Sequence, residues 1–171
     1  MKHKYQIKTG RVVLRPLTAA EAQQLRILRN QNSQMFFQGG EITSKAQAEW
    51  YKHYLGTEND YMFSIYLLPD KRWIGAVSIY HVDRDMGRCE FGRLMIDHSA
   101  TDERGLGVEA TLAACQFAFQ QLNLSSIYLE VFSDNLAAVK TYERAGFRHC
   151  ETRYTDGGRA VFHMEKYKSE R

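Results

Sequence analysis

One stretch of this sequence joins a strand-like segment to a second one through a glycine-containing loop and a helical segment. Residues 88–96 are predicted to form the first strand, residues 105–122 the helix and residues 126–132 the second strand. A strand, a helix and a strand in succession are expected to leave the two strands parallel, with the helix as the crossover. This unit indicates an α/β fold.

The middle of the chain has the pattern of an antiparallel meander. Residues 69–71 and 83–87 are turn signals, and each lies between two apolar runs. We therefore predict a mixed, largely antiparallel central sheet flanked by helices. The strands still to be assigned are expected at residues 12–17, 61–68, 73–81, 147–153 and 159–166.

Two helices are expected ahead of this meander, because two segments begin with a capping-box pattern. Thr18 is followed three residues later by Glu21, and Ser44 is followed three residues later by Gln47; in such pairs each side chain caps a backbone N–H group. The first helix is expected to run to about residue 30. Its predicted buried residues are Ala22, Leu25 and Leu28, and the second helix carries Trp50, Tyr51 and Tyr54.

Composition narrows the class of protein. The chain has 171 residues, of which 44% are hydrophobic and 25% charged, as expected for one soluble domain spanning residues 1–171, with its core at about 9–167. The net charge of +3 is spread along the chain, so no nucleic-acid partner is expected. We see no signal peptide and no membrane-length apolar run, which favours a cytoplasmic location. The 3 cysteines form no CxxC pair, and no metal is expected.

The loop at residues 102–107 is the first segment with chemical meaning. Gly105 and Gly107 allow the backbone N–H groups to approach a ligand closely. The helix N-terminus that follows favours an anion such as a pyrophosphate. A glycine pair alone is also compatible with a simple tight turn before a helix.

A second segment, residues 135–147, follows after one strand. Asn135 can cap a helix, Tyr142 lies near its end and Gly146 stands where a glycine ends a helix. The two segments together resemble the GNAT superfamily of N-acetyltransferases. The acetyl-CoA loop of that family has the form Q/R-x-x-G-x-G/A, and the later element has the form N-x-x-A-x-x-x-Y-x-x-x-G-F. The second form is matched by Asn135, Ala138, Tyr142, Gly146 and Phe147.

This resemblance covers the whole chain and adds detail to the fold and the cosubstrate. It implies a GNAT-like single domain in which the parallel strand pair is splayed, and acetyl-CoA as the cosubstrate. Residues 13–17 and the Glu109-Ala110 pair resemble the RimJ/RimL branch. One departure is Asp102, where the family has Gln or Arg; Arg104 is expected to compensate for its charge. The cofactor-binding residues implied are Leu94, Met95, Ile96, Arg104, Gly105, Leu106, Gly107, Val108, Asn135 and Tyr142.

Two residues are candidates for proton transfer. Some GNAT enzymes place a catalytic Glu near the position of Glu90, which is either the general base or a structural or substrate-orienting carboxylate. Tyr142 is either the general acid for the coenzyme A thiolate or a ring packed beneath the cofactor. Strand alternation predicts that Glu90, Gly92, Leu94 and Ile96 share one face, and free backbone groups near 94–96 would stabilise the oxyanion.

The acceptor site is expected beside the first two helices. Phe36, Phe37, Trp50 and Tyr54 are its candidate walls, and residues 34–40 have the composition of a closing lid; packing roles are equally open for these rings. Among other chemically tempting side chains, Cys115 is assigned to the core and Glu130 to a structural role, and Cys89 has no identifiable partner His for nucleophilic chemistry. His81 and His98 lie near strand ends and could line a pocket, but a surface role is favoured for both.

Three functions are compatible with these residues. The first is N-acetylation of a small primary amine such as an amino sugar on a nucleotide, since Leu28-Arg29-Asn30 recurs in such relatives. The second is protein N-terminal acetylation of the RimJ/RimL type. The third is a non-catalytic acyl-CoA-binding module, which would leave Glu90 and Tyr142 without a role. A homodimer is compatible with the sequence.

Overall fold

The computed structural model describes residues 1–35, 37 and 39–169, and within them one mixed sheet contains eight strands. The strand order is β1-β2-β3-β4-β5-β6-β8-β7. Each neighbouring pair in this described sheet is antiparallel except β5 and β6, which are parallel, as predicted. The strands are β1 Ile7–Thr9, β2 Val12–Pro16, β3 Tyr61–Leu67, β4 Arg72–Asp83, β5 Arg88–Ile96, β6 Ser126–Phe132, β7 Arg148–Tyr154 and β8 Ala160–Tyr167.

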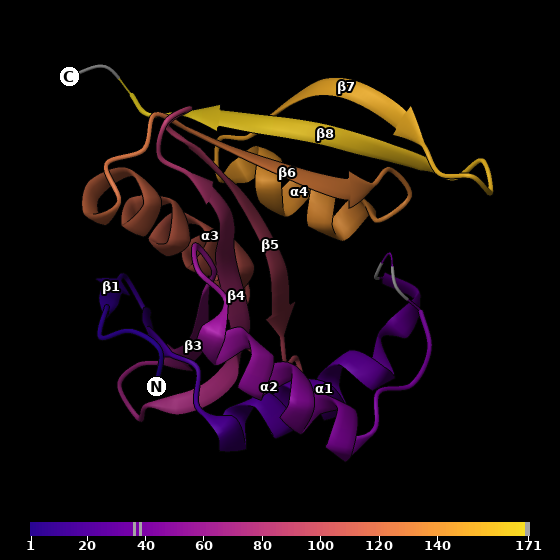
Figure 1. Ribbon diagram of the computed structural model, residues 1–171. Helices are drawn as coiled ribbons and strands as arrows, with labels where there is room; N and C mark the ends of the chain where they lie inside the picture. The colour runs from indigo at the N-terminus through magenta and orange to yellow at the C-terminus, as the bar shows by residue number, and fades with distance from the viewer. Residues whose placement is uncertain (36, 38, 170–171) are drawn as a thin grey trace.

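Helices cover both faces of the sheet (Figure 1). α1 and α2 pack with one buried cluster, which contains Leu25, Tyr54 and Met95. α3 and α4 pack with the larger cluster on the other face, which contains Ala114 and Phe91. None of the described helices has the length and apolar content to cross a bilayer. The helices are α1 Ala19–Gln31, α2 Ser44–Gly56, α3 Leu106–Gln116, its π-helical continuation Phe117–Gln121, α4 Leu136–Arg144 and a 3-10 turn Ser33–Met35.

One of the two predicted capping boxes is confirmed. Thr18 Oγ1 accepts from the Glu21 backbone N–H at 3.3 Å, and the Glu21 carboxylate accepts from the Thr18 N–H at 2.9 Å. The second prediction is wrong by one residue, because Thr43 caps α2 by accepting from the Ala46 N–H. Gln47 does not return to the cap and instead donates to a carbonyl of α1 at 2.8 Å, so it ties α2 to α1.

The predicted alternation along β5 is wrong beyond Gly92. The pairing of β5 with β4 is interrupted between Gly92 and Met95 by a bulge, at which Arg93 has φ of 53°. A bulge adds one residue and reverses which side chains point to each face. Leu94 and Ile96 therefore pack against the larger cluster with Phe91, whereas Met95 points to the opposite face.

A second bulge lies in β4, directly across from β5. Tyr80 pairs with Glu90, and the next pair joins Asp83 to Arg88, so β4 has one extra residue there. His81 occupies this bulge with φ of 47°. Its side chain is thereby turned to the same face as Tyr80 and Glu90, as their hydrogen bonds show below.

β5 and β6 separate after a short parallel ladder. The pairing runs from Arg88 and Ser126 to Glu90 and Tyr128. Beyond Glu90, β5 stays with β4, while β6 continues along β8, and the two halves of the sheet diverge (Figure 1). The splayed parallel pair is therefore confirmed, and it opens the sheet next to Glu90.

Candidate active site

Two neighbouring cavities form the candidate site. The larger of the two, of about 700 Å³, lies where β5 and β6 diverge. Its walls come from four segments that are far apart in the sequence. The segments are the loop before α3, the second half of β5, the end of β6 and the exposed side of α4. Among the lining residues are Phe91, Leu94, Thr101, Arg104, Gly107, Phe132, Ala138 and Tyr142.

The N-terminus of α3 opens onto this cavity without a side-chain cap. Gly105 occupies the N-cap position with φ of 80°, a conformation that favours glycine. The first amides of a helix have no partner within the helix, so they are available to an anion. Arg104 and Arg144 also line the cavity. Uncapped amides beside two guanidinium groups fit a molecule that bears a pyrophosphate.

Arg11, in the turn between β1 and β2, holds this loop in place. Its Nε donates to Glu109 at 2.7 Å, its Nη1 to Glu103 at 2.8 Å and its Nη2 to the Arg104 carbonyl at 2.9 Å. Its backbone N–H also donates to Glu109 at 2.8 Å. One side chain therefore fixes the first turn of α3 and the loop ahead of it.

Tyr142 is almost fully buried and lines the larger cavity from the last part of α4. Its ring lies edge-on to Phe91, with centroids 5.5 Å apart. Burial raises the pKa of its hydroxyl well above the ordinary value of 10.0. The hydroxyl therefore stays protonated at neutral pH and has the chemical state of a proton donor.

Glu90 lies at the point where the strands separate, and both of its carboxylate oxygens accept hydrogen bonds. Tyr80 donates to Oε1 at 2.9 Å, and His81 Nδ1 donates to Oε2 at 2.7 Å. The Tyr80 ring lies across Gly92, where a Cβ atom would be 2.8 Å from the hydroxyl. Burial, and next the charge of Glu90, raise the pKa of Tyr80.

A smaller cavity of about 390 Å³ lies beside the larger one. Its aromatic wall is the stacked pair Trp50 and Tyr54, with centroids 5.5 Å apart and ring planes 7° from parallel. Its polar wall includes Glu58 and Asp60, and Asp60 pairs with Arg93 at 2.8 Å. Arg93 lines both cavities, so the two are neighbours. The remaining lining residues are His53, Thr57, Asn59, His81 and Val82.

The structure brings most of the predicted site residues together. The larger cavity is lined by Phe37, Glu90, Leu94, Ile96, Arg104, Gly105, Leu106, Gly107, Val108, Asn135 and Tyr142. Met95 does not line it, because the Arg93 bulge turns its side chain into the opposite cluster. The predicted acceptor wall is divided, since Trp50 and Tyr54 line the smaller cavity. Phe36 lies outside the described residues.

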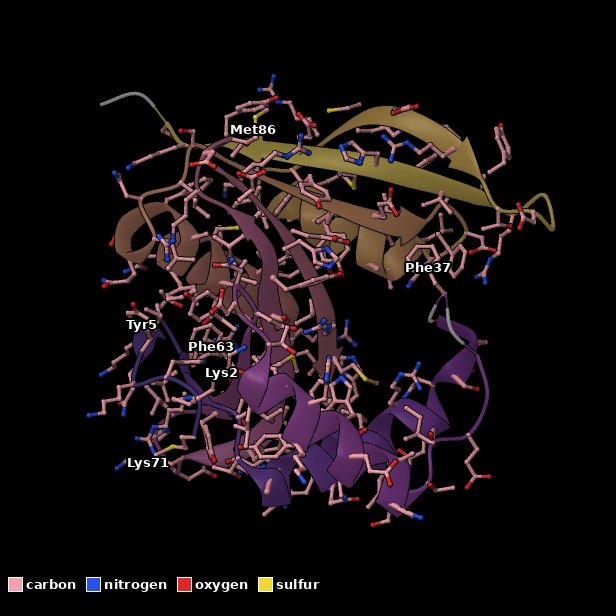
Figure 2. The ribbon with its side chains drawn as sticks, in the orientation of Figure 1. Lys2, Tyr5, Phe37, Phe63, Lys71 and Met86 are labelled. Atoms are coloured by element: carbon pink, nitrogen blue, oxygen red, sulfur yellow. The ribbon has the colours of Figure 1, made fainter. Side chains whose placement is uncertain are left out.

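Phe37 links the α1–α2 connection to the far half of the sheet. Figure 2 shows it beneath the end of β6 and the beginning of β8. Its ring centroid is 4.4 Å from that of Phe132, and the guanidinium of Arg159 lies 3.5 Å from the centroid of Phe132 on β6. Phe37 and Phe132 therefore meet at the wall of the larger cavity.

The two buried cysteines have the inert character that the sequence predicted. Burial raises the pKa of Cys89 and of Cys115 to about 12, so neither is a ready thiolate nucleophile. His98 and Glu130 line the larger cavity. Within the described residues, no group of three or more His, Cys, Asp or Glu side chains is arranged to hold a metal ion.

Sequence reasoning missed Arg11, Asp60 and Arg93, which line the two cavities or hold their walls in place. Arg11 contacts Glu109 across 98 residues, and Asp60 contacts Arg93 across 33 residues, so no local motif announces either contact. The sequence favours a surface position for His81 over a place in a pocket, whereas the bulge in β4 turns its side chain to Glu90. A bulge has no dependable sequence signal when its positive-φ residue is not glycine.

Comparison with known proteins points to acetyl transfer. The model of the acetyltransferase (GNAT) domain family matches residues 11–148. A probable N-acetyltransferase, YjcK of Bacillus subtilis, is 27% identical over 150 residues, which cover 82% of each chain.

Two solved structures share the fold. The first is a spermidine N-acetyltransferase from Vibrio cholerae in complex with CoA and spermine, with a TM-score of 0.82, 21% identity and coverage of 93% of this chain and 96% of that one. The second is a GNAT-family acetyltransferase from Bacillus anthracis, with a TM-score of 0.78, 15% identity and coverage of 95% and 98%.

Proposed function

The chain belongs to the GNAT family of acetyltransferases, and we propose that it acetylates a primary amine of a small polycationic molecule, with acetyl-CoA as the acetyl donor. The chain is an enzyme of the N-acetyltransferase class, so a non-catalytic acyl-CoA-binding module is not retained. The observation that carries the choice of acceptor is the smaller cavity, where stacked rings and carboxylates lie next to the larger cavity.

The donor is proposed to occupy the larger cavity. Its pyrophosphate would meet the uncapped amides of residues 105–108, with Arg104 and Arg144 supplying positive charge. The pantetheine arm would follow the edge of β5 beyond Glu90, whose backbone groups have no partner on β6. Preorganised backbone donors of this kind stabilise the charge that develops on a thioester oxygen.

The smaller cavity has the chemistry to recognise an ammonium group. The partly exposed Trp50 ring, stacked on the buried Tyr54, offers a π face, and Glu58 and Asp60 offer negative charge. The protein's own Lys2, labelled in Figure 2, illustrates the match with one of these rings. Its ammonium lies 4.3 Å from the centroid of the Tyr54 ring and donates to the Thr57 carbonyl.

The same walls argue against a nucleotide-linked amino sugar. A phosphate in the smaller cavity would face Glu58 and Asp60. Arg93 Nη1 already donates to both carboxylate oxygens of Asp60, at 2.8 and 2.9 Å, so the positive charge of Arg93 is partly compensated before any phosphate approaches. A polyamine also agrees with the spermidine N-acetyltransferase whose fold this chain shares.

Protein N-terminal acetylation is the remaining alternative. A volume of about 390 Å³ suits a small molecule better than the end of a protein chain, which needs an open groove. A peptide acceptor would support the RimJ/RimL branch, which residues 13–17 and 109–110 resemble. We therefore include peptides in the test as the competing outcome.

The transfer requires two proton movements. An alkyl ammonium with a pKa near about 10.4 must lose a proton before it attacks the thioester. We assign this step to the neighbourhood of Glu90, which lines the larger cavity at its junction with the smaller one. As the nitrogen–carbon bond forms and the carbon–sulfur bond breaks, we assign Tyr142 to protonate the departing thiolate.

Steady-state kinetics with spermidine and a monoamine of similar length test the proposal. We expect spermidine to have a kcat/KM on the order of 10-fold higher, because its second and third charges meet the acidic wall. Glu58→Gln should raise KM for spermidine by about 2-fold to 5-fold, the range for an exposed ion pair. Glu49→Gln, an exposed carboxylate on α2 outside the smaller cavity, is the matched control.

Two outcomes would contradict the proposal. Equal kcat/KM values for spermidine and the monoamine would show that the acidic wall does not recognise charge. Peptide or amino-sugar acceptors that outperform both would move the acceptor to another class.

A further inference from the structure

We propose that His81 is the group that receives the proton from the acceptor amine, and that Glu90 is the residue that positions His81. This inference rests on the proposed function, because it assigns a residue to the proton transfer of that reaction. It differs from the direct use of Glu90 as the base.

The hydrogen bond between the two residues sets which nitrogen of His81 is basic. Glu90 Oε2 accepts from His81 Nδ1 at 2.7 Å. In a neutral imidazole, a proton on Nδ1 leaves Nε2 with its lone pair free to accept another proton. Among the described residues, none bonds to His81 Nε2. The ring is therefore held in the tautomer that a base needs.

Glu90 itself is less accessible than His81. Both of its oxygens already accept hydrogen bonds, and its side chain is only 16% exposed. The His81 side chain is 68% exposed, and it lines the smaller cavity in which we place the acceptor. An incoming ammonium group would thus meet His81 before it reached the larger cavity lined by Glu90.

The backbone is distorted at the residues that this arrangement requires. His81 and Arg93 both have positive φ, and each lies in a bulge of one of two paired strands. A residue that is not glycine costs of order 1–3 kcal/mol in such a conformation, and bulges often re-aim side chains next to active sites. Without its bulge, His81 would point into the larger cluster, where Val82 packs instead.

The proton balance of the step is complete. The ammonium gives one proton to Nε2 of His81, and the neutral amine then forms the bond to the acetyl carbon. The electron pair of the carbon–sulfur bond leaves with sulfur, and the thiolate takes the proton of Tyr142. The second nitrogen proton is lost as the amide forms and replaces the proton that Tyr142 gave. The exposed ring of His81 returns its proton to water, and the Glu90 carboxylate compensates its charge in between.

Several groups around His81 also carry or change charge. The face of the sheet contributes Tyr80, Glu90 and Arg93, and β6 contributes Tyr128 next to Glu90. The helix α2 and the loop after it contribute the other groups of the smaller cavity, namely His53, Tyr54, Glu58 and Asp60. Asp83 follows His81 on β4. Because all of these groups contribute to the pH profile of the wild-type enzyme, that profile alone does not identify the base. The test therefore compares the pH profiles of variants with that of the wild type.

The test uses His81→Asn and His81→Gly, because Asn and Gly both tolerate positive φ. We expect His81→Asn to lower kcat/KM for spermidine at about pH 7 by on the order of 10²-fold or more. The loss should shrink toward about pH 10, where the amine deprotonates by itself. The KM for acetyl-CoA should not change. His149→Asn, an exposed histidine of β7 outside both cavities, is the control.

Two further arms separate a base from a structural residue. Added imidazole should restore activity to His81→Gly, since the deletion leaves an exposed space for a free base. Glu90→Gln should lose less activity than His81→Asn, because the amide oxygen still accepts from Nδ1. Calorimetric binding of acetyl-CoA shows that each variant is folded.

The outcomes discriminate between the inference and the proposed function. If the wild-type enzyme is active, two results would overturn the role of His81 and leave the proposed function intact. One is full activity of the His81 variants at about pH 7, and the other is a His81→Gly variant that imidazole does not reactivate. A larger loss in Glu90→Gln than in His81→Asn would return the role of base to Glu90. A wild-type enzyme that acetylates no amine between about pH 7 and about pH 10 would overturn both proposals.

Discussion

Arg11 donates two hydrogen bonds to Glu109, through its backbone N–H at 2.8 Å and through its Nε at 2.7 Å, and its Nη2 forms an ion pair with the same carboxylate. The same guanidinium reaches Glu103 and the Arg104 carbonyl. This contact connects the turn between β1 and β2 to the first turn of α3. It holds the candidate pyrophosphate loop in one conformation before any ligand arrives, so the ordering cost is already met when the ligand binds.

Loss of this contact should weaken donor binding rather than chemistry. We expect Arg11→Ala to raise KM for acetyl-CoA by on the order of 5-fold or more, with kcat for saturating donor nearly unchanged. Glu109→Ala should act in the same direction and more strongly than Glu103→Ala, because Glu103 accepts only one of these bonds within the described structure. If KM for acetyl-CoA in all three variants equals that of the wild-type enzyme, the loop does not depend on Arg11.

The glycine at the N-cap of α3 gives a second prediction. Gly105→Val forces a branched side chain into φ of 80° at the mouth of the larger cavity, so we expect acetyl-CoA binding to be lost in calorimetry. Gly158→Val is a matched control, because Gly158 has φ of 81° and open space around it. Similar affinities in the two variants would contradict the assignment of the pyrophosphate to this loop.

Tyr142→Phe removes the proposed acid and keeps the ring. We expect kcat to fall by about 10-fold to 100-fold, with the Kd for acetyl-CoA little changed, because the packing against Phe91 remains. Pre-steady-state measurements must first show that chemistry limits the rate. If it does and kcat is unaffected, the role of Tyr142 is confined to packing.

The buried tyrosines also predict how stability changes with pH. Burial raises the pKa of Tyr54, Tyr80 and Tyr142 above 10.0, so the folded chain keeps protons that the unfolded chain releases. The free energy of unfolding is therefore insensitive to these groups below about pH 10 and falls as pH rises above it. In urea titrations, Tyr142→Phe should reduce this slope by up to about 1.4 kcal/mol per pH unit; an unchanged slope would contradict the burial effect.

The two aromatic walls predict different kinetic effects. Trp50 lines the smaller cavity and Phe37 the larger one. We expect Trp50→Ala to raise KM for the amine and to leave KM for acetyl-CoA unchanged, while Phe37→Ala should also affect the donor. Parallel changes in both KM values for Trp50→Ala would indicate that the smaller cavity is not the acceptor site.

Local sequence patterns predicted the elements more reliably than the directions of their side chains. The bounds of β5 and β6 agree with expectation, since turns and apolar runs mark their ends. The face assignments along β5 failed beyond Gly92, because the bulge at Arg93 depends on the pairing with β4. The parallel pair followed from the order of strand, helix and strand. Its separation after Glu90 was expected only through the family resemblance.

The residues of the candidate site also fall into two groups, those in local sequence motifs and those that join the site only through the fold. The glycine loop and residues 135–147 form local motifs, and both line the larger cavity. Arg11, Asp60 and His81 join the site through tertiary contacts and a bulge, for which the sequence offers no periodic signal. Long-range contacts of this kind require the fold to be known.

A competition assay tests the central claim most directly. The enzyme receives isotope-labelled acetyl-CoA and an equimolar mixture of spermidine, a nucleotide-linked amino sugar and a short peptide with a free N-terminus, and mass spectrometry measures the labelled products at low conversion. Under competition, the product ratio equals the ratio of kcat/KM values. The account predicts that labelled N-acetylspermidine dominates, and a mixture dominated by acetylated peptide or amino sugar would contradict it.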